Sequence, residues 1–387
     1  MSITKVSEPS GKPSIQDDLW HIVSSDNSSG EDFKYVFDVY VDGEQLSRVK
    51  LFPDTTTGKG YYDPHKIVQG SITYDWFEPE DKIYLRSPDT SGQMSIEYTV
   101  QYGEDASGVT TTNMASDTVR AYNWRPDVFK RRVMGLSDKN NTFVTDRPFS
   151  AKCSVDSAEA LMIGIHSPGA VSCIINKYGY DNSLIAGDNS SSTSLFTDYC
   201  QLNISPAGIN GQLGAGFINS AVKYYTVEID ELDGVTFRVD IICDREFTAI
   251  PLHFINKYGM FDTARFGLVS RLTMDAERKS FKQREYKFGA TSVDYKDSKG
   301  VYYESKINYA QRAEFSYKLN MDAPSDDEYK WLSDLILSPQ IYAQIDGYFY
   351  PVTIKATNYE FSEYVFNRFK VFEIDIELNQ TVYGHGR

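Results

Sequence analysis

The sequence lacks long apolar runs, paired cysteines and targeting signals. No window approaches 18 successive apolar residues, so we expect no transmembrane helix. Residues 1–32 contain no apolar h-region, no lipobox-like cysteine and no positive n-region, so we expect no secretory route. The four cysteines are widely spaced, lie in or beside apolar stretches and form no CxxC pair, which predicts reduced core thiols rather than a zinc site: Cys153, Cys173, Cys200 and Cys243.

Catalytic motifs are also missing. The five histidines show neither HExxH nor another metal-ligand spacing, and there is no GxSxG elbow: His21, His65, His166, His253 and His385. His253 lies in an apolar stretch, where a histidine is more often a core residue than a base. We therefore predict no catalytic, cofactor-binding or metal-binding residues, and no cofactor.

Acidic residues outnumber basic ones, but they form no pair suited to catalysis. The chain has 54 Asp and Glu against 39 Lys and Arg, a net charge of −15, which argues against a nucleic-acid-binding protein. Asp375 and Glu377 are two apart on a predicted strand and share the face opposite Ile374 and Ile376, as on a solvated strand edge. A glycosidase needs two carboxyl groups about 5–9 Å apart across a cleft, and no motif provides this. We therefore predict that the chain is not an enzyme.

What the sequence does have is length, apolar content and aromatics. A chain of 387 residues, 41% of them hydrophobic, can form two to four domains with real cores. The 28 Tyr and 22 Phe favour pleated sheets or large interfaces. Either an all-β protein or an aromatic ligand-binding surface would account for them.

The first third of the chain predicts an arm followed by a β-domain. Residues 1–32 are rich in Ser, Asp and Gly around one apolar island at Trp20, so they are either a flexible arm or an arm that docks on a neighbouring subunit. Residues 33–124 predict a β-sandwich-like domain, with an alternating strand that turns at Asp42-Gly43 into a hairpin. The glycine-rich stretch 54–60 lacks the Gly-Lys-Ser/Thr ending of a phosphate loop, which predicts a surface turn.

Residues 125–290 predict a second β-domain with a basic linker at 125–132. The stretches 188–193 and 208–216 are polar or glycine-rich and predict exposed loops, and 225–243 predicts a hairpin that turns at Asp233-Gly234.

The pentapeptide Ile-Asn-Lys-Tyr-Gly occurs at 175–179 and again at 255–259. Two copies of one unit, or shared strand-to-turn chemistry, would each explain this repetition.

Residues 291–387 predict an α+β module in which one helix packs on an antiparallel sheet. A long alternating strand at 307–319 is followed by a capping box that begins at Ser325, and then by a short amphipathic helix. Trp331 lies on the apolar face of this helix, which Pro339 prevents from continuing. Asp346-Gly347 predicts a further hairpin. The chain as a whole is therefore predicted to be mainly β, with several antiparallel β-sandwich-like domains and this C-terminal module.

Several short motifs resemble a pattern found in virion proteins of tailed phages. Residues 252–266 hold Phe-Ile-Asn-Lys-Tyr-Gly followed by Phe-Asp-x-x-x-Phe, and the basic stretch after them leads to Arg284-Glu285-Tyr286. Residues 331–342 and 350–360 are similar to the same group. This is the group of structural tail and ring (collar) proteins of crAss-like and related phages. In that group the strand turn reads aromatic-Leu-Asn-Arg-x-Gly-Gly. Here Lys257 stands in the place of the Arg, and one Gly of the Gly-Gly pair is missing. The motifs describe fold, so no functional residues carry over.

The resemblance implies a structural virion protein that forms a ring or collar in the tail or in a portal-proximal assembly. Its partners would be copies of itself and neighbouring tail, portal or fibre proteins, with no sequence-specific nucleic acid and no membrane. It would be made in the host cytoplasm and located in the virion. The alternative is a glycan-binding, receptor-binding protein of a phage or of a bacterial surface, which exposed Tyr and Trp platforms would favour.

Overall fold

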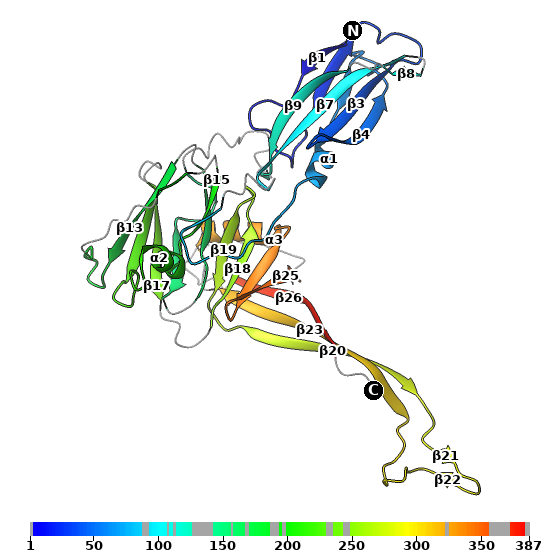
Figure 1. Cartoon of the computed structure of the whole chain (residues 1–387), viewed down its shortest axis with the longest axis vertical. Helices are drawn as coiled ribbons and strands as arrows, with labels where there is room; N and C mark the ends of the chain where they lie inside the picture. Colours follow the sequence, from blue (N-terminus) through cyan, green and yellow to red (C-terminus); the bar gives the residue numbers. More distant parts are fainter. Residues whose placement is uncertain are drawn as a thin grey trace. The chain divides into compact units, whose positions relative to one another are not determined.

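The structure is a computed structural model, and it is mainly β, with several antiparallel sheets and short helices among the described residues (Figure 1). The residues that it describes are 3–86, 93–106, 108–110, 114–125, 142–155, 158–166, 170–185, 193–195, 199–229, 235–242, 248–321, 325–355 and 372–383. The chain divides into two compact units. Unit 1 comprises Met1–Cys243, His253–Ala264 and Lys330–Gln340, and unit 2 comprises Asp244–Leu252, Arg265–Tyr329 and Ile341–Arg387. The four-part division at residues 32, 124 and 290 stays a prediction.

Unit 1 begins with two sheets that share one core and form a β-sandwich-like arrangement. The larger sheet has the order β4-β3-β7-β8, with β9 also paired to β7, and the smaller has the order β1-β2-β5. Side chains from both sheets, among them Phe37, Val100 and Val23, are buried together. The elements are β1 (Ile3–Ser7), β2 (His21–Ser25), β3 (Lys34–Val41), β4 (Glu44–Leu51), β5 (Gly60–Tyr62), α1 (His65–Gly70), β7 (Ser95–Ala106), β8 (Val109–Thr110) and β9 (Ala115–Tyr122).

The first 32 residues differ from the expected arm. β1 pairs with β2, and β2 pairs with β5, so this segment supplies two strands of the smaller sheet. Ile15 and Leu19 are fully buried in the shared core, while Trp20 is 45% exposed. The polar composition suggested an arm because β1 buries only Ile3 and β2 buries only alternate side chains. Tertiary packing therefore orders a segment that has little local propensity to fold.

Two predicted turns are confirmed. Asp42 and Gly43 connect β3 to β4 with φ of 51° and 80°, the left-handed pair that a two-residue hairpin turn needs. In the stretch 54–60, the Asp54 carboxylate accepts hydrogen bonds from the backbone N–H groups of Thr56 and Thr57. Asp54 thus closes a surface turn with donors from its own loop.

The middle of unit 1 contains two further sheets around a second core. One sheet has the order β10-β12-β15-β6 and the other β11-β17-β16-β13-β14, in which β11 and β17 run parallel. Fully buried Ile163, Leu202, Val227 and Phe237 lie in this core. The elements are β6 (Tyr84–Arg86), β10 (Thr142–Phe143), β11 (Ser150–Ser154), β12 (Met162–His166), β13 (Ala170–Tyr178), β14 (Thr193–Leu195), β15 (Tyr199–Asn203), α2 (Pro206–Leu213), β16 (Tyr224–Ile229) and β17 (Thr236–Ile242).

The loop predicted at 208–216 is wrong, because most of it belongs to helix α2. The Ser205 hydroxyl accepts a hydrogen bond from the N–H of Gly208, and Pro206 occupies the first turn, as in a standard helix start. Ile209 is fully buried in the core. Glycine content suggested a loop, but Gly211 is needed since a Cβ there would lie 1.9 Å from the backbone oxygen of Asp81. The predicted turn at 233–234 and most of the predicted loop at 188–193 lie outside the described residues.

The two copies of Ile-Asn-Lys-Tyr-Gly adopt different structures. At 175–179 the strand β13 continues through Tyr178 and pairs with β16. At 255–259 the strand β18 (Ile250–Ile255) ends, and Asn256 accepts hydrogen bonds from the N–H groups of Tyr258 and Met260. The repetition therefore reflects no repeated structural unit.

The remaining strands form a seven-stranded sheet of order β19-β18-β24-β25-β26-β23-β20. Strands β20, β23, β24, β25 and β26 lie in unit 2 and pair antiparallel. The elements are β19 (Phe261–Phe266), β20 (Arg271–Lys282), β21 (Lys287–Phe288), β22 (Val293–Asp294), β23 (Lys306–Met321), α3 (Asp326–Ile336), β24 (Ile341–Ile345), β25 (Tyr348–Ile354) and β26 (Phe372–Tyr383).

The predicted helix and its signals are confirmed. The Ser325 hydroxyl accepts from the N–H of Glu328, and the Glu328 carboxylate accepts from the N–H of Ser325, which is the reciprocal pair of a capping box. Helix α3 ends at Ile336, before Pro339. Trp331 is 2% exposed and packs against Phe254 of β18, with ring centroids 5.4 Å apart. A helix therefore packs on this sheet, as predicted, and Tyr329 contacts Phe372 of β26, but Trp331 packs on β18, which lies outside the predicted module of residues 291–387.

Candidate interaction surface

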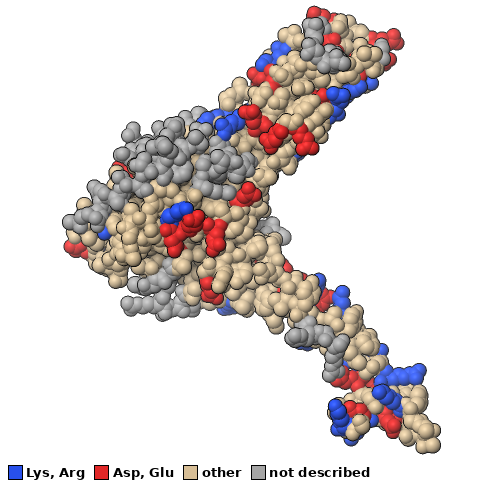
Figure 2. Space-filling model, viewed as in Figure 1, with Lys and Arg blue, Asp and Glu red and all other residues tan. Residues whose placement is uncertain are grey.

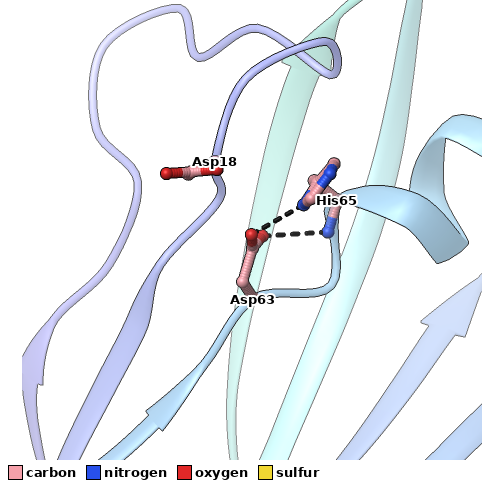
Figure 3. Close-up of side chains that lie close together, drawn as sticks. All are labelled: Asp18, Asp63 and His65. Atoms are coloured by element: carbon pink, nitrogen blue, oxygen red, sulfur yellow. Dashed lines mark hydrogen bonds and ion pairs between the residues drawn. The ribbon is translucent and has the colours of Figure 1, made fainter.

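One group of described acidic and histidine side chains is close enough together to hold a metal ion, but hydrogen bonds within the chain account for its arrangement. Ligand atoms of Asp18, Asp63 and His65 lie within 4.8 Å of one another. Asp63 Oδ1 accepts from the N–H groups of Leu19 and His65, and its Oδ2 lies 2.6 Å from His65 Nδ1 (Figure 3). Asp18 accepts from Trp20 Nε1 at 3.3 Å. Asp63 thus fastens the segment before β2 to the start of α1.

A second polar cluster lies in the interior of unit 1. Asp262 is 1% exposed, and its Oδ2 accepts hydrogen bonds from Thr145 Oγ1 at 2.6 Å and Trp331 Nε1 at 2.8 Å. The Arg147 guanidinium lies over the Trp331 ring, 4.8 Å from its centroid. Burial raises the pKa of Asp262 to about 6, against the lowering effect of these donors and of Arg147. The cluster is sealed from solvent, so its role is to join β19, α3 and the segment around Thr145.

A neighbouring carboxylate extends this internal network. Asp334 of α3 forms an ion pair with Arg125 and accepts from the N–H of Lys257 at 3.1 Å. Burial raises the pKa of Asp334, and the Arg125 charge opposes that shift. The hydroxyl of Ser338 accepts from the N–H of Ile255. Polar groups of residues 330–340 are thus used to anchor this segment rather than to present a reactive site.

Those candidate residues named from the sequence that the structure describes lie in the core or on the outer face of a strand. His253 is fully buried, and its Nδ1 lies 2.8 Å from Thr263 Oγ1, so it is a core residue as predicted. Asp375 and Glu377 lie on the outer face of β26, where Glu377 is 3.3 Å from Lys355 Nζ. The described cysteines are buried thiols, as predicted: Cys153, Cys173 and Cys200. Cys243, His385 and residues 126–132 of the basic linker lie outside the described residues.

The longest run of described residues without a buried side chain is in unit 2 and includes the segment that we call the ribbon, residues 268–318. Strands β20 and β23 pair from Arg271↔Lys318 to Lys282↔Lys306, and residues 283–305, the ribbon tip, connect them. Figure 1 shows these strands running side by side to a hairpin end that carries β21 and β22. All 51 residues are described, and not one of them is buried. A two-stranded hairpin is at best marginally stable by itself in water. The ribbon therefore has no core of its own.

The two faces of the ribbon differ in polarity. On one face, Leu272 pairs with Tyr317 and Met274 pairs with Phe315. Leu272 and Met274 are 55% and 58% exposed, although Leu319, two residues beyond Tyr317 on the same strand, is fully buried. The core-facing side of the sheet thus continues into an exposed apolar strip. The opposite face is charged, as in the ion pair between Arg312 and Glu277 at 2.5 Å.

The ribbon tip is an exposed cluster of aromatic rings and cations. Phe288, Tyr295 and Tyr302 are 68%, 57% and 66% exposed. Lys296 Nζ lies 4.3 Å from the centroid of the Tyr302 ring, and the Arg284 guanidinium lies 5.8 Å from that of Phe288. These contacts order the tip locally while leaving most of each ring exposed. Large exposed apolar groups of this kind mark interaction surfaces.

The ribbon also has the opposite charge to the chain that carries it. It contains eleven Lys or Arg and seven Asp or Glu, a net charge of +4, whereas the whole chain carries −15. The residues outside the ribbon therefore carry −19. Figure 2 shows Lys and Arg gathered at the end of the ribbon with acidic side chains between them.

The basic stretch that leads to Arg284-Glu285-Tyr286 was recognised from the sequence, but the pairing of β20 with β23 was not predicted. A signal was present. Residues 271–282 and 306–318 both contain alternating apolar positions, and between them lie turn residues such as Asp297 and Gly300, where Gly300 has φ of 81°. The alternation indicates strands, but it cannot tell whether anything covers the apolar side.

Comparison with known proteins adds no assignment, since no protein-family model and no curated sequence matches the chain. Within the part of the chain that the structure describes, no helix is long and apolar enough to cross a membrane.

Proposed function

We propose that this chain is a structural protein of a tailed-phage virion that forms a ring or collar through large protein–protein interfaces and carries out no catalysis. The observation that carries the proposal is the ribbon, 51 consecutive ordered residues of which not one is buried. Ordering a residue costs about 1–2 kcal/mol of backbone conformational entropy, and the ribbon has no core to offset that cost. A neighbouring protein would supply the missing buried surface.

Two further features are consistent with assembly. The polar clusters at Asp63 and Asp262, both among the described residues, are engaged in hydrogen bonds within the chain, so neither of them argues against a role in assembly. The motifs around residues 252–266 and 331–342 resemble those of phage tail and ring proteins, and this resemblance is the reason for proposing the virion. The partners would be copies of the chain and adjacent tail, portal or fibre proteins.

The test is a count of copies in the particle. Mass measurement of intact virions, with electron microscopy of the purified protein, should give a closed cyclic assembly with many copies per tail. One to three copies per virion would refute the ring and favour a tip or fibre protein.

A second candidate function is glycan binding, and the exposed rings of Phe288, Tyr295 and Tyr302 favour it. Aromatic faces can stack on sugar rings. Titration of the purified chain with host surface polysaccharide, monitored by isothermal titration calorimetry, should give no binding heat if the role is assembly. A saturable binding heat that is lost in Tyr302→Ala would favour a receptor-binding role instead.

A further inference from the structure

We propose that the ribbon binds, tip first, to the acidic surface of a second copy of this chain, so that each copy donates a ribbon and accepts one. This inference rests on the proposed assembly function, and it names the element that holds neighbouring copies together. Three properties lead to it: the charge of the ribbon against that of the remaining sequence, the polarity of its faces and the chemistry of its edge strand.

The charge of the ribbon favours a second copy of the chain as its partner. A ribbon of +4 is attached to a remainder of −19, so the ribbon of one copy is attracted to the body of another. The same numbers disfavour a nucleic acid, because the −19 remainder would repel the phosphates that the ribbon attracted. Acidic side chains exposed before β6, such as Glu78 and Asp81, illustrate the kind of surface that would receive it.

Polarity of the faces explains how such an interface would be stable. Leu272 and Met274 on one face of β20 are each more than half exposed, and so are Phe288, Tyr295 and Tyr302 of the tip. Covering these side chains would contribute about 25 cal/mol for each Å² of apolar surface removed from water. A standard interface takes about 20–30 residues from each partner, and the ribbon offers 51. Its size and composition are therefore sufficient for a stable contact.

The edge strand argues for docking through side chains rather than through strand addition. β20 is the last strand of its sheet, and half of its twelve residues are charged: Arg271, Asp275, Glu277, Arg278, Lys279 and Lys282. Charges along an exposed edge oppose pairing with the edge of another sheet. A ribbon that binds the body of another copy is a heterologous contact, and repeated contacts of this kind close into a ring when the rotation between copies allows it.

The principal test removes the ribbon tip. Because the N–H of Gln283 donates to the carbonyl oxygen of Ser305, these two residues form a hydrogen-bonded pair, and residues 284–304 between them can be replaced by Asn-Gly, which forms the two-residue turn that such a pair needs. The deleted segment contains no buried residue, so the variant should retain the unfolding temperature of the full chain. In native mass spectrometry we expect the full chain to form oligomers and the shortened chain to stay monomeric.

Mixing the two proteins tests the direction of the contact. A shortened chain cannot donate a tip but can still accept one, so a mixture should contain oligomers that each end in one shortened copy. If shortened copies never join full-length ones, the contact is tip to tip and the proposed docking on the body is refuted.

Charge variants provide a second route that leaves the chain length unchanged. Lys287→Glu with Lys299→Glu reverses two exposed tip charges, and Lys59→Glu with Lys66→Glu makes the same change in net charge outside the ribbon. We expect the tip pair to weaken self-association at least about tenfold, an effect that high salt reduces. The control pair should change it little.

The outcomes separate this inference from the proposed function. Rings that form equally well with the shortened chain would overturn the role of the ribbon and leave the ring itself standing. A full chain that is monomeric at every concentration and present in few copies per particle would overturn both. Binding of single-stranded DNA that depends on Lys287 and Lys299, in a chain that does not self-associate, would overturn the second copy as the partner.

Discussion

Replacement of Trp331 measures directly how the C-terminal helix is held. Its ring is 2% exposed and lies between Phe254, with centroids 5.4 Å apart, and the Arg147 guanidinium. Its Nε1 donates to Asp262 at 2.8 Å. Trp331→Ala removes a large buried side chain, which costs about 3–5 kcal/mol. Trp331→Phe keeps most of the packing and removes the donor, which costs about 1–3 kcal/mol because Asp262 is buried.

The assay is thermal unfolding followed by far-ultraviolet circular dichroism, because loss of a tryptophan alters fluorescence. A change of 1 kcal/mol shifts the melting temperature by about 2–4 °C in a cooperative unit of about 150–250 residues. We expect Trp331→Ala to lower it by roughly 6–20 °C and Trp331→Phe by less. Trp20→Ala is the matched control, since Trp20 is 45% exposed, and it should shift stability by less than about 0.5 kcal/mol. Equal melting of the Trp331→Ala and Trp20→Ala chains would refute the assignment of Trp331 to the core.

Three further variants test the interior. Asp262 has a folded pKa of about 6, above the unfolded value of 3.8, so its protonated form favours folding at low pH. This contribution to the free energy of unfolding, about 3 kcal/mol, is lost as pH rises from 4 to 6. Asp262→Asn should abolish that pH dependence in urea titrations carried out at each pH. Burial lowers the pKa of His21 to about 4, so the wild type should lose stability as pH falls from 6.5 to 4, and His21→Gln should be less acid-sensitive. Gly211→Ala should destabilise despite its helical position, because the new Cβ would meet the Asp81 backbone, whereas Gly70→Ala, with open space, should be neutral or stabilising in the same melting assay.

Local chemistry explains which parts of the fold could be predicted from sequence. The turns at Asp42-Gly43 and Asp346-Gly347 need two successive positive φ values, and few other dipeptides supply them, so the hairpins follow from the residues themselves. The capping box at Ser325 is likewise complete within four residues. Each of these signals is short, and the groups that form it are adjacent in the chain.

Segments whose structure depends on distant residues were not predictable in the same way. Leu19 is buried because strands of both sheets surround it, and nothing in the polar sequence of residues 1–32 specifies that packing. Helix α2 has a recognisable start at Ser205-Pro206. Its glycines Gly208 and Gly211 are required because Asn203 and Asp81 lie too close to the helix to leave room for a Cβ. The cluster around Asp262 joins residues from 145 to 331, so no local spacing could reveal it.

The ribbon has strands that its local sequence predicts and an exposure that depends on the rest of the chain, and this combination points to a function in binding. Its strands follow from alternating residues such as Leu272 and Met274, whereas its exposure depends on what the rest of the chain leaves uncovered. Leu319 and Tyr317 lie two residues apart on one face of β23, yet the first is fully buried and the second is only partly covered. The apolar pattern of the strand thus extends beyond the core that the described chain provides. A pattern of that length is explained if a second surface covers the remainder, and the +4 charge of the ribbon against −19 elsewhere supports another copy of the chain as its source.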